Sequence, residues 1–170
     1  VSFDIDEGEF TAIAGPSGSG KTTILNIAGC LDQPSFGKVI FDGKDIAGRS
    51  ADQLADLRRH QLGFIFQTFN LIPVLDAYEN VEFPLLMKGD LSPAERKEWI
   101  ETILREVGLE EFMKRRPAEL SGGQQQRVAI ARALVKKPRL VLADEPTANL
   151  DSNTGREILT QMKELNRRYG

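Results

Sequence analysis

The feature that most constrains the fold of this chain is a glycine-rich loop between an apolar segment and a helical one. Residues 15–22 read Gly-Pro-Ser-Gly-Ser-Gly-Lys-Thr and match the pattern G-x-x-x-x-G-K-[ST] in full. The apolar run 10–14 predicts a short strand before the loop, and the apolar spacing in 21–31 predicts a helix after it. In that context the glycines let backbone N–H groups surround phosphates, and the helix N-terminus adds positive potential. The loop therefore predicts a nucleoside triphosphate site.

Strand and helix patterns alternate along the rest of the chain. Strands are predicted over residues 1–5, 39–41, 62–66 and 139–143. Helices are predicted over residues 50–60, 78–88 with a break near Pro84, 92–107, 122–137 and 153–169. Such alternation predicts an α/β fold with a mostly parallel core sheet. We also expect an antiparallel β edge. Residues 76–120 contain helices and no strand, which predicts a helical subdomain set apart from the sheet.

Length and composition limit the class of protein. The 170 residues fit one domain that can bury a core, and the net charge of −3 gives no basic footprint for nucleic acid. The single cysteine, Cys30, excludes an internal disulfide and is predicted to be buried. No apolar run is long enough to span a bilayer, and no signal peptide is visible. The chain starts inside a strand pattern and stops after a helical one, so we expect a domain truncated at both ends.

Two acidic residues follow the apolar strand 140–143. Asp144 stands where a Mg²⁺ ligand belongs next to a phosphate loop, and Glu145 is positioned to act as general base on an attacking water. Their alternative is a strand end with two solvated acids. Gln67 directly follows the strand 62–66, where its amide can orient water or reach the metal. Lys21 would place a charge at the β- and γ-phosphates, and Thr22 a hydroxyl at Mg²⁺.

A second glycine-rich helix start lies at residues 120–124, which read Leu-Ser-Gly-Gly-Gln. The hydroxyl of Ser121 and the N–H groups of Gly122 and Gly123 can bind an anion there. One nucleoside triphosphate has only one set of phosphates. Either this second helix start is idle, or it serves a different nucleotide.

The order of these motifs resembles the nucleotide-binding subunit of ABC transporters over essentially all 170 residues. The order is the phosphate loop, Gln67, the LSGGQ sequence with the following QQRVAIARAL, Asp144-Glu145, and then Ala-Asn-Leu-Asp at 148–151. Phe69 to Pro73 with Glu79-Asn80-Val81 is most similar to the branch that serves lipoprotein release, macrolide export and cell division.

The resemblance implies a head-to-tail dimer that binds ATP and Mg²⁺ between the phosphate loop of one subunit and the LSGGQ sequence, called the signature, of the other. The residues implied at the subunit's own ATP are Gly15, Pro16, Ser17, Gly18, Ser19, Gly20, Lys21, Thr22 and Thr23. Those implied at the partner's ATP are Ser121, Gly122, Gly123 and Gln124. The implied metal-site residues are Thr22, Gln67 and Asp144, and the implied catalytic residues are Glu145, Gln67 and Lys21.

The resemblance also implies the setting of the protein. Asp151 would lie on the loop that crosses the dimer interface, and membrane permease subunits would dock near residues 67–73. The subunit would be peripheral on the cytoplasmic face of the inner membrane. Residues 1–75 and 121–170 would form the catalytic core, with 76–120 as the helical subdomain. ATP-driven closure and reopening of the dimer would then power transport by the membrane subunits.

Some parts of the family pattern fall outside the sequence, and other functions stay open. The adenine-stacking aromatic would precede Val1 and the γ-phosphate histidine would follow Gly170, so we expect weak or no ATPase activity from this chain alone. Ala148 stands where many relatives have serine or glycine. The alternatives are a soluble ABC ATPase acting on DNA or the ribosome, and a module that holds ATP without turnover. The absence of sustained heptads between the two glycine-rich motifs argues against the DNA-acting class, and Glu145 against the module.

Overall fold

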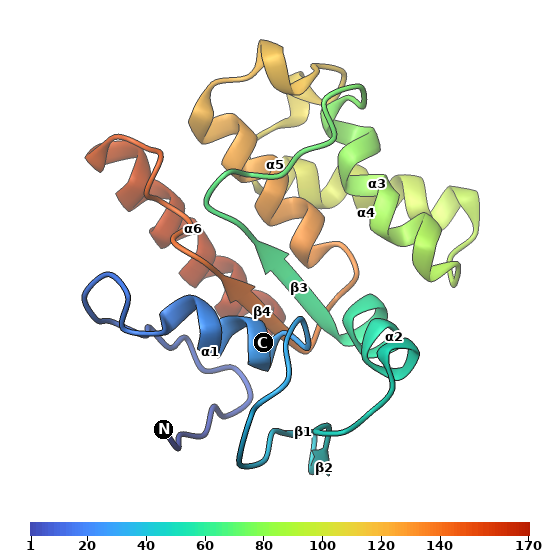
Figure 1. The fold of residues 1–170 in the computed structure, drawn as a ribbon. Coiled ribbons are helices and arrows are strands. Elements are labelled where there is room, and N and C mark those ends of the chain that lie inside the picture. Colours follow the sequence, from blue (N-terminus) through green and yellow to red (C-terminus); the bar gives the residue numbers. More distant parts are fainter.

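A computed structural model describes residues 1–170 of the chain. Two parallel strands, β3 (Leu62–Ile65) and β4 (Leu140–Ala143), lie at the centre of the molecule (Figure 1). They pair in register from their first residue to their last, so both end at the same edge. A separate antiparallel hairpin is formed by β1 (Ile40–Phe41) and β2 (Lys44–Asp45). The fold is α/β with a parallel central pair and an antiparallel β element, as the sequence predicts.

Six α-helices surround the strands. They are α1 (Lys21–Ala28), α2 (Ala51–Gln61), α3 (Ala77–Lys88), α4 (Pro93–Glu106), α5 (Gly122–Leu134) and α6 (Ser152–Tyr169), with two 3₁₀ turns, η1 (Glu110–Phe112) and η2 (Pro117–Glu119). In Figure 1, α1 and the β1–β2 hairpin lie on one side of the central strands and α3, α4 and α5 on the other. The helices α2 and α4 begin at the predicted places, each with a capping box, at Ser50 and Ser92.

Helix α5 is the centre of the larger hydrophobic core. Its residues Val128, Ala129, Ile130 and Ala131 are completely buried, and α3 and β3 both pack against it. The approach to β3 is close, because a Cβ built on Gly63 would lie 2.7 Å from the carbonyl oxygen of Ala133. Small residues in α5 and at Gly63 therefore let this helix lie directly on the strand that leads to Gln67.

Residues 1–14 form no strand, contrary to the prediction for 1–5 and 10–14. Their side chains are exposed, and the only backbone hydrogen bond among them closes a turn from Glu9 to Asp6. Alternation identifies an apolar face, but an extended segment becomes a strand only by pairing with a neighbour. The segment does contact α6, because Asn166 Nδ2 donates to the Gly8 carbonyl oxygen at 2.8 Å.

Two helices end earlier than predicted, and one is not broken where a break was predicted. Helix α1 stops at Ala28 because Cys30 adopts φ 58°, and α5 stops at Leu134 because Lys137 adopts φ 53°.

Helix α3 continues through Pro84. A proline removes one N–H donor, but the buried face of α3, which includes Val81 and Leu85, holds the helix against α5.

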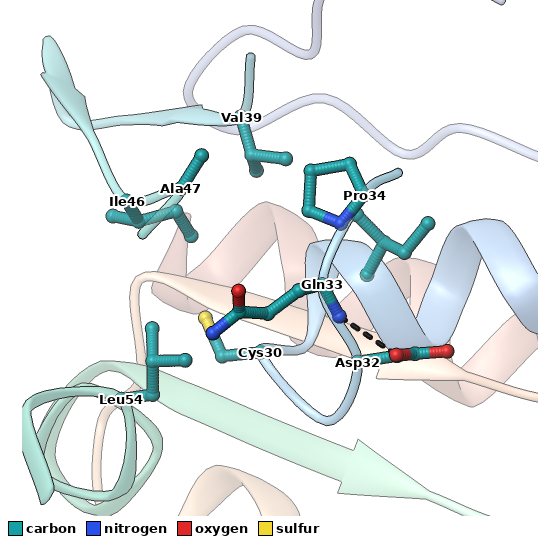
Figure 2. A pocket seen from close by; sticks show the side chains of 9 residues that line it. Cys30, Asp32, Gln33, Pro34, Val39, Ile46, Ala47 and Leu54 are labelled. Carbon is teal, nitrogen blue, oxygen red and sulfur yellow. Dashed lines mark hydrogen bonds between the residues drawn. The ribbon is translucent and has the colours of Figure 1, made fainter. Parts of the chain in front are cut away.

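A small second core lies between the end of α1, the hairpin and α2. It contains Cys30, Ile46, Leu54 and Leu62, and Figure 2 shows the first three of these around a narrow cavity. The cavity measures about 10 Å³, which is room for no more than a water-sized group. Cys30 is buried there, as predicted, and serves as packing.

Candidate nucleotide-binding site

The phosphate loop has a backbone that requires its glycines. Gly18 and Gly20 lie in the left-handed region, with φ of 78° and 92°, and a Cβ on Gly15 would lie 2.7 Å from Ser19 Oγ. Lys21 Nζ donates to the carbonyl oxygens of Gly15 and Pro16 at 2.9 and 3.1 Å. The charge of Lys21 therefore lies at the loop itself. Because the glycines have no side chains, the loop backbone offers little steric obstruction to an approaching phosphate.

Thr22 and Asp144 come together although they are far apart in the sequence. The hydroxyl of Thr22 lies 3.3 and 3.2 Å from the two carboxylate oxygens of Asp144. A hydroxyl beside a carboxylate is the oxygen donor set that Mg²⁺ uses in phosphate-loop proteins, where phosphates and water complete the coordination. The pair therefore fits the predicted metal. No cluster of three or more His, Cys, Asp or Glu side chains offers an alternative metal site.

Gln67 and Glu145 lie at the edge where β3 and β4 end. Ile65 pairs with Ala143, and Asp144 N donates to the Ile65 carbonyl oxygen at 3.0 Å, so the residues that follow leave the sheet side by side. Both Gln67 and Glu145 are exposed to solvent. This edge therefore brings the predicted base and the predicted water-orienting amide near the Thr22–Asp144 pair.

The signature residues 121–124 form a separate group. Ser121 and Gln124 make a capping box, in which Ser121 Oγ accepts from Gln124 N at 3.3 Å and Gln124 Oε1 accepts from Ser121 N at 2.9 Å. No hydrogen bond or ion pair joins residues 121–124 to the phosphate loop. The N–H groups of Gly122 and Gly123 have no acceptor within the helix, because the first turn of a helix leaves its donors unpaired.

The signature glycines pack closely on the segment after β4. A Cβ on Gly123 would lie 2.7 Å from Thr154 Cγ2, and one on Gly122 would lie 3.3 Å from Leu150 Cδ2. Asp151 caps α6, and hydrogen bonds from Thr154 hold the pKa of its carboxyl below the usual value. The signature and the 148–151 loop are therefore one packed unit.

Three polar residues support the site without having been predicted to do so. Asn149 Nδ2 donates to the Gln67 carbonyl oxygen at 2.9 Å, and Gln126 Nε2 donates to that of Pro146 at 2.7 Å. Arg132 donates to the carbonyl oxygens of Asn70 and Phe69 at 2.6 and 2.8 Å. Polar residues on the inward face of an alanine-rich helix were the available signal for the two in α5, but nothing in the sequence identified their acceptors.

Residues 1–148 match the sequence model of the ABC transporter family. With the phosphate loop, the strand-end carboxylates and the signature on one α/β fold, the chain belongs to this family of ATP-binding proteins. It is 51% identical over 165 residues to an uncharacterized ABC transporter ATP-binding protein of Thermotoga maritima, covering 97% of this chain and 70% of that protein. It is 52% identical over 173 residues to the ABC transporter ATP-binding protein MJ0796 of Methanocaldococcus jannaschii, covering 100% and 74%.

Two further comparisons concern a larger protein and a solved structure. The macrolide export ATP-binding/permease protein MacB of Marinobacter nauticus is 51% identical over 167 residues, which are 98% of this chain and 26% of that protein. The chain thus spans about a quarter of that relative. A dimeric post-hydrolysis state of the ATP-binding cassette MJ0796, bound to ADP and Pi, superposes with a TM-score of 0.87 at 51% identity. That comparison covers 99% of this chain and 74% of the cassette.

Proposed function

We propose that this chain is the ATP-hydrolysing subunit or domain of a transporter and works as one half of a head-to-tail pair. The observation that carries the proposal is the contact of Thr22 with Asp144 beside the strand edge that holds Gln67 and Glu145. It brings a phosphate loop, a metal donor pair and a candidate base into one place. That combination suits hydrolysis of a nucleoside triphosphate rather than binding alone.

Different residues of the site bind the phosphates, hold the metal and activate the water. The N–H groups of residues 15–22 bind the phosphates, and Lys21 neutralises their charge. Thr22 and Asp144 hold Mg²⁺, which neutralises charge on the phosphate oxygens when bound. Glu145 accepts a proton from the attacking water, and Gln67 orients that water. Thr23, the next residue of α1, lies at the same helix start and takes part in phosphate binding.

The second anion site belongs to the partner. Residues 121–124 make no hydrogen bond or ion pair with this chain's own phosphate loop, yet they present unpaired N–H groups at the start of α5. We propose that they bind the γ-phosphate of ATP held by a second ABC ATPase subunit. The dimeric state of the similar cassette MJ0796 supports this arrangement. Asp151, at the start of α6, lies in the segment that would face the partner.

The proposed transporter also contains membrane subunits. None of the helices is both long and apolar enough to cross a bilayer. We propose that permease subunits dock near residues 67–73, where the neighbouring Val74 is 72% exposed, and that residues 76–120 move as a helical subdomain. The ATPase would then be peripheral on the cytoplasmic face of the inner membrane. We propose export of macrolide- or lipoprotein-type substrates, and the similarity to the macrolide export protein MacB supports the first of these.

The test uses Glu145→Gln and Lys21→Ala in the full-length protein. Glu145→Gln should reduce turnover to a small residual rate and trap an ATP-bound dimer that gel filtration detects, because binding persists while the base is lost. Lys21→Ala should lose nucleotide binding and stay monomeric with ATP. A Glu145→Gln protein that remains monomeric with saturating ATP would contradict the paired arrangement, and normal ATP affinity in Lys21→Ala would contradict the phosphate-loop assignment.

A further inference from the structure

Gln126 is an unusual residue for the middle of a hydrophobic core. Only two polar side chains, Gln126 and Asn80, are completely buried. Asn80 uses both ends of its amide on the backbone of the loop before α3. Gln126 uses only one end, because Nε2 donates to the Pro146 carbonyl oxygen at 2.7 Å while Oε1 has no hydrogen-bond partner.

A buried amide with an unpaired oxygen lowers stability relative to an apolar side chain of the same shape. Gln126 lies on the same helix as the completely buried apolar residues Val128–Ala131, and complete burial by itself favours an apolar residue such as methionine or leucine. Packing therefore does not explain a glutamine here. The single hydrogen bond to Pro146 does.

The acceptor of that hydrogen bond follows Glu145 directly. Glu145 adopts φ 45°, a left-handed conformation that is uncommon for a residue with a side chain. Its own carbonyl oxygen accepts from Ala148 N at 3.1 Å, which closes a tight turn. Such a backbone persists only where the surroundings hold it. The hydrogen bond from α5 fixes the Pro146–Thr147 peptide unit, which lies one residue beyond the strained Glu145.

We propose that Gln126 is the positioning residue for Glu145. By holding the Pro146 carbonyl it fixes the direction in which the strained turn presents the Glu145 carboxylate. Gln126 also follows the signature by less than one helical turn. Helix α5 would thus carry both the residues proposed to bind the partner's nucleotide and the residue that positions the base at this chain's own nucleotide. The inference rests on the proposed role of Glu145.

The test compares Gln126→Met with Gln125→Met in the full-length protein. Methionine keeps the length of glutamine but cannot donate. Gln125 is a matched control on the same helix, because its Nε2 donates instead to the Leu120 carbonyl oxygen at 3.1 Å. For Gln126→Met we expect kcat for ATP to fall roughly 10- to 100-fold through a misplaced base, while KM stays within about twofold. The thermal midpoint should change little, because the substitution removes the unpaired Oε1 but also leaves the Pro146 carbonyl without its donor. Gln125→Met should keep kcat within about twofold of the parent.

A double-mutant cycle separates positioning from a general structural effect. If Gln126 acts through Glu145, adding Gln126→Met to Glu145→Gln should cause no further loss of the residual turnover. Equal losses in both backgrounds, a kcat near that of the parent, or a loss that appears as weaker ATP binding would each overturn the proposal. Failure of the underlying function is distinguishable, because Glu145→Gln alone would then retain turnover.

Discussion

The hydroxyl of Thr22 contacts both carboxylate oxygens of Asp144, at 3.3 and 3.2 Å. Thr22 is the second residue of α1 and Asp144 follows β4 directly, so the contact ties the phosphate loop to the end of the central strand pair. The relationship links the sequence motif for phosphate with the sequence motif for metal in a single site.

Loss of either partner should weaken metal binding. We expect Thr22→Ala and Asp144→Asn to raise the Mg²⁺ concentration for half-maximal ATPase activity at least about tenfold, because each removes one oxygen donor. A titration of activity with Mg²⁺ at saturating ATP measures this. Thr160→Val is the control, because that hydroxyl donates to the Arg156 carbonyl oxygen on α6 and should leave the titration unchanged. Parent-like Mg²⁺ dependence in both site variants would exclude the pair as metal ligands.

The second prediction concerns Gly123. Alanine there would bring a methyl group 2.7 Å from Thr154 Cγ2, so the contact between α5 and α6 must shift. Overpacking of this kind costs about 1–3 kcal/mol, partly offset by the roughly 1 kcal/mol that alanine gains over glycine in a helix. We expect the free energy of unfolding to fall in Gly123→Ala and to recover in Gly123→Ala/Thr154→Ser. Denaturant unfolding measures both.

Gly122→Ala provides the comparison. Its added methyl group would meet the end of the flexible Leu150 side chain at 3.3 Å and would touch the Phe69 ring at an ordinary contact distance of 3.9 Å. Its stability should therefore stay close to that of the parent. Equal destabilisation of the Gly122 and Gly123 variants would show that the Thr154 contact is not what limits residue size in the signature.

Local signals in the sequence predicted most of the fold. The capping boxes at Ser50 and Ser92 set two helix starts, and the apolar runs before Gln67 and Asp144 set both central strands. Each of these signals depends on neighbours within a few residues. The strands predicted within 1–14 failed because strand formation depends on a pairing partner, which the local pattern does not specify.

The supporting polar contacts could not be predicted for a similar reason. Arg132 donates to carbonyl oxygens of Phe69 and Asn70, and Gln126 to that of Pro146, and backbone carbonyls carry no sequence signal. The site motifs themselves were evident because the phosphate loop and the strand-end acids are defined by residue type and spacing. What holds them in place is defined by the packing of α5.

Arg132 should be important for stability. Its guanidinium donates to two carbonyl oxygens, on Phe69 and Asn70, both of which adopt left-handed φ values of 60° and 50°. Burial lowers the pKa of this guanidinium, and no carboxylate pairs with it. Arg132→Met leaves both carbonyls without this donor, so we expect a loss of about 2 kcal/mol in the free energy of unfolding. Denaturant unfolding provides the measurement.

Arg139→Met is the matched control for Arg132→Met. Arg139 is exposed and pairs with Asp42 at 3.0 Å, and a surface ion pair contributes about 0–1 kcal/mol. A loss in Arg132→Met no larger than that in Arg139→Met would mean that the turn after Gln67 does not need its arginine.

Lys136 should make stability depend on pH above neutrality. Its Nζ donates to the carbonyl oxygens of Arg58 and Leu62 at 2.9 and 2.7 Å, but burial, with Lys88 nearby, lowers its pKa from 10.5 to about 8. Between these two pH values the unfolded chain binds the proton more strongly than the folded chain does. The contribution of Lys136 to folding therefore becomes more favourable as the pH rises from about 8 toward 10.5.

Denaturant unfolding of the parent and of Lys136→Met at several pH values tests this dependence. Their difference in free energy of unfolding should be constant below the folded pKa of about 8 and should shift in favour of the parent above it. Because all other titrating groups are shared, the difference isolates Lys136. Parallel stability curves for the parent and Lys136→Met across this range would contradict a lowered pKa at Lys136.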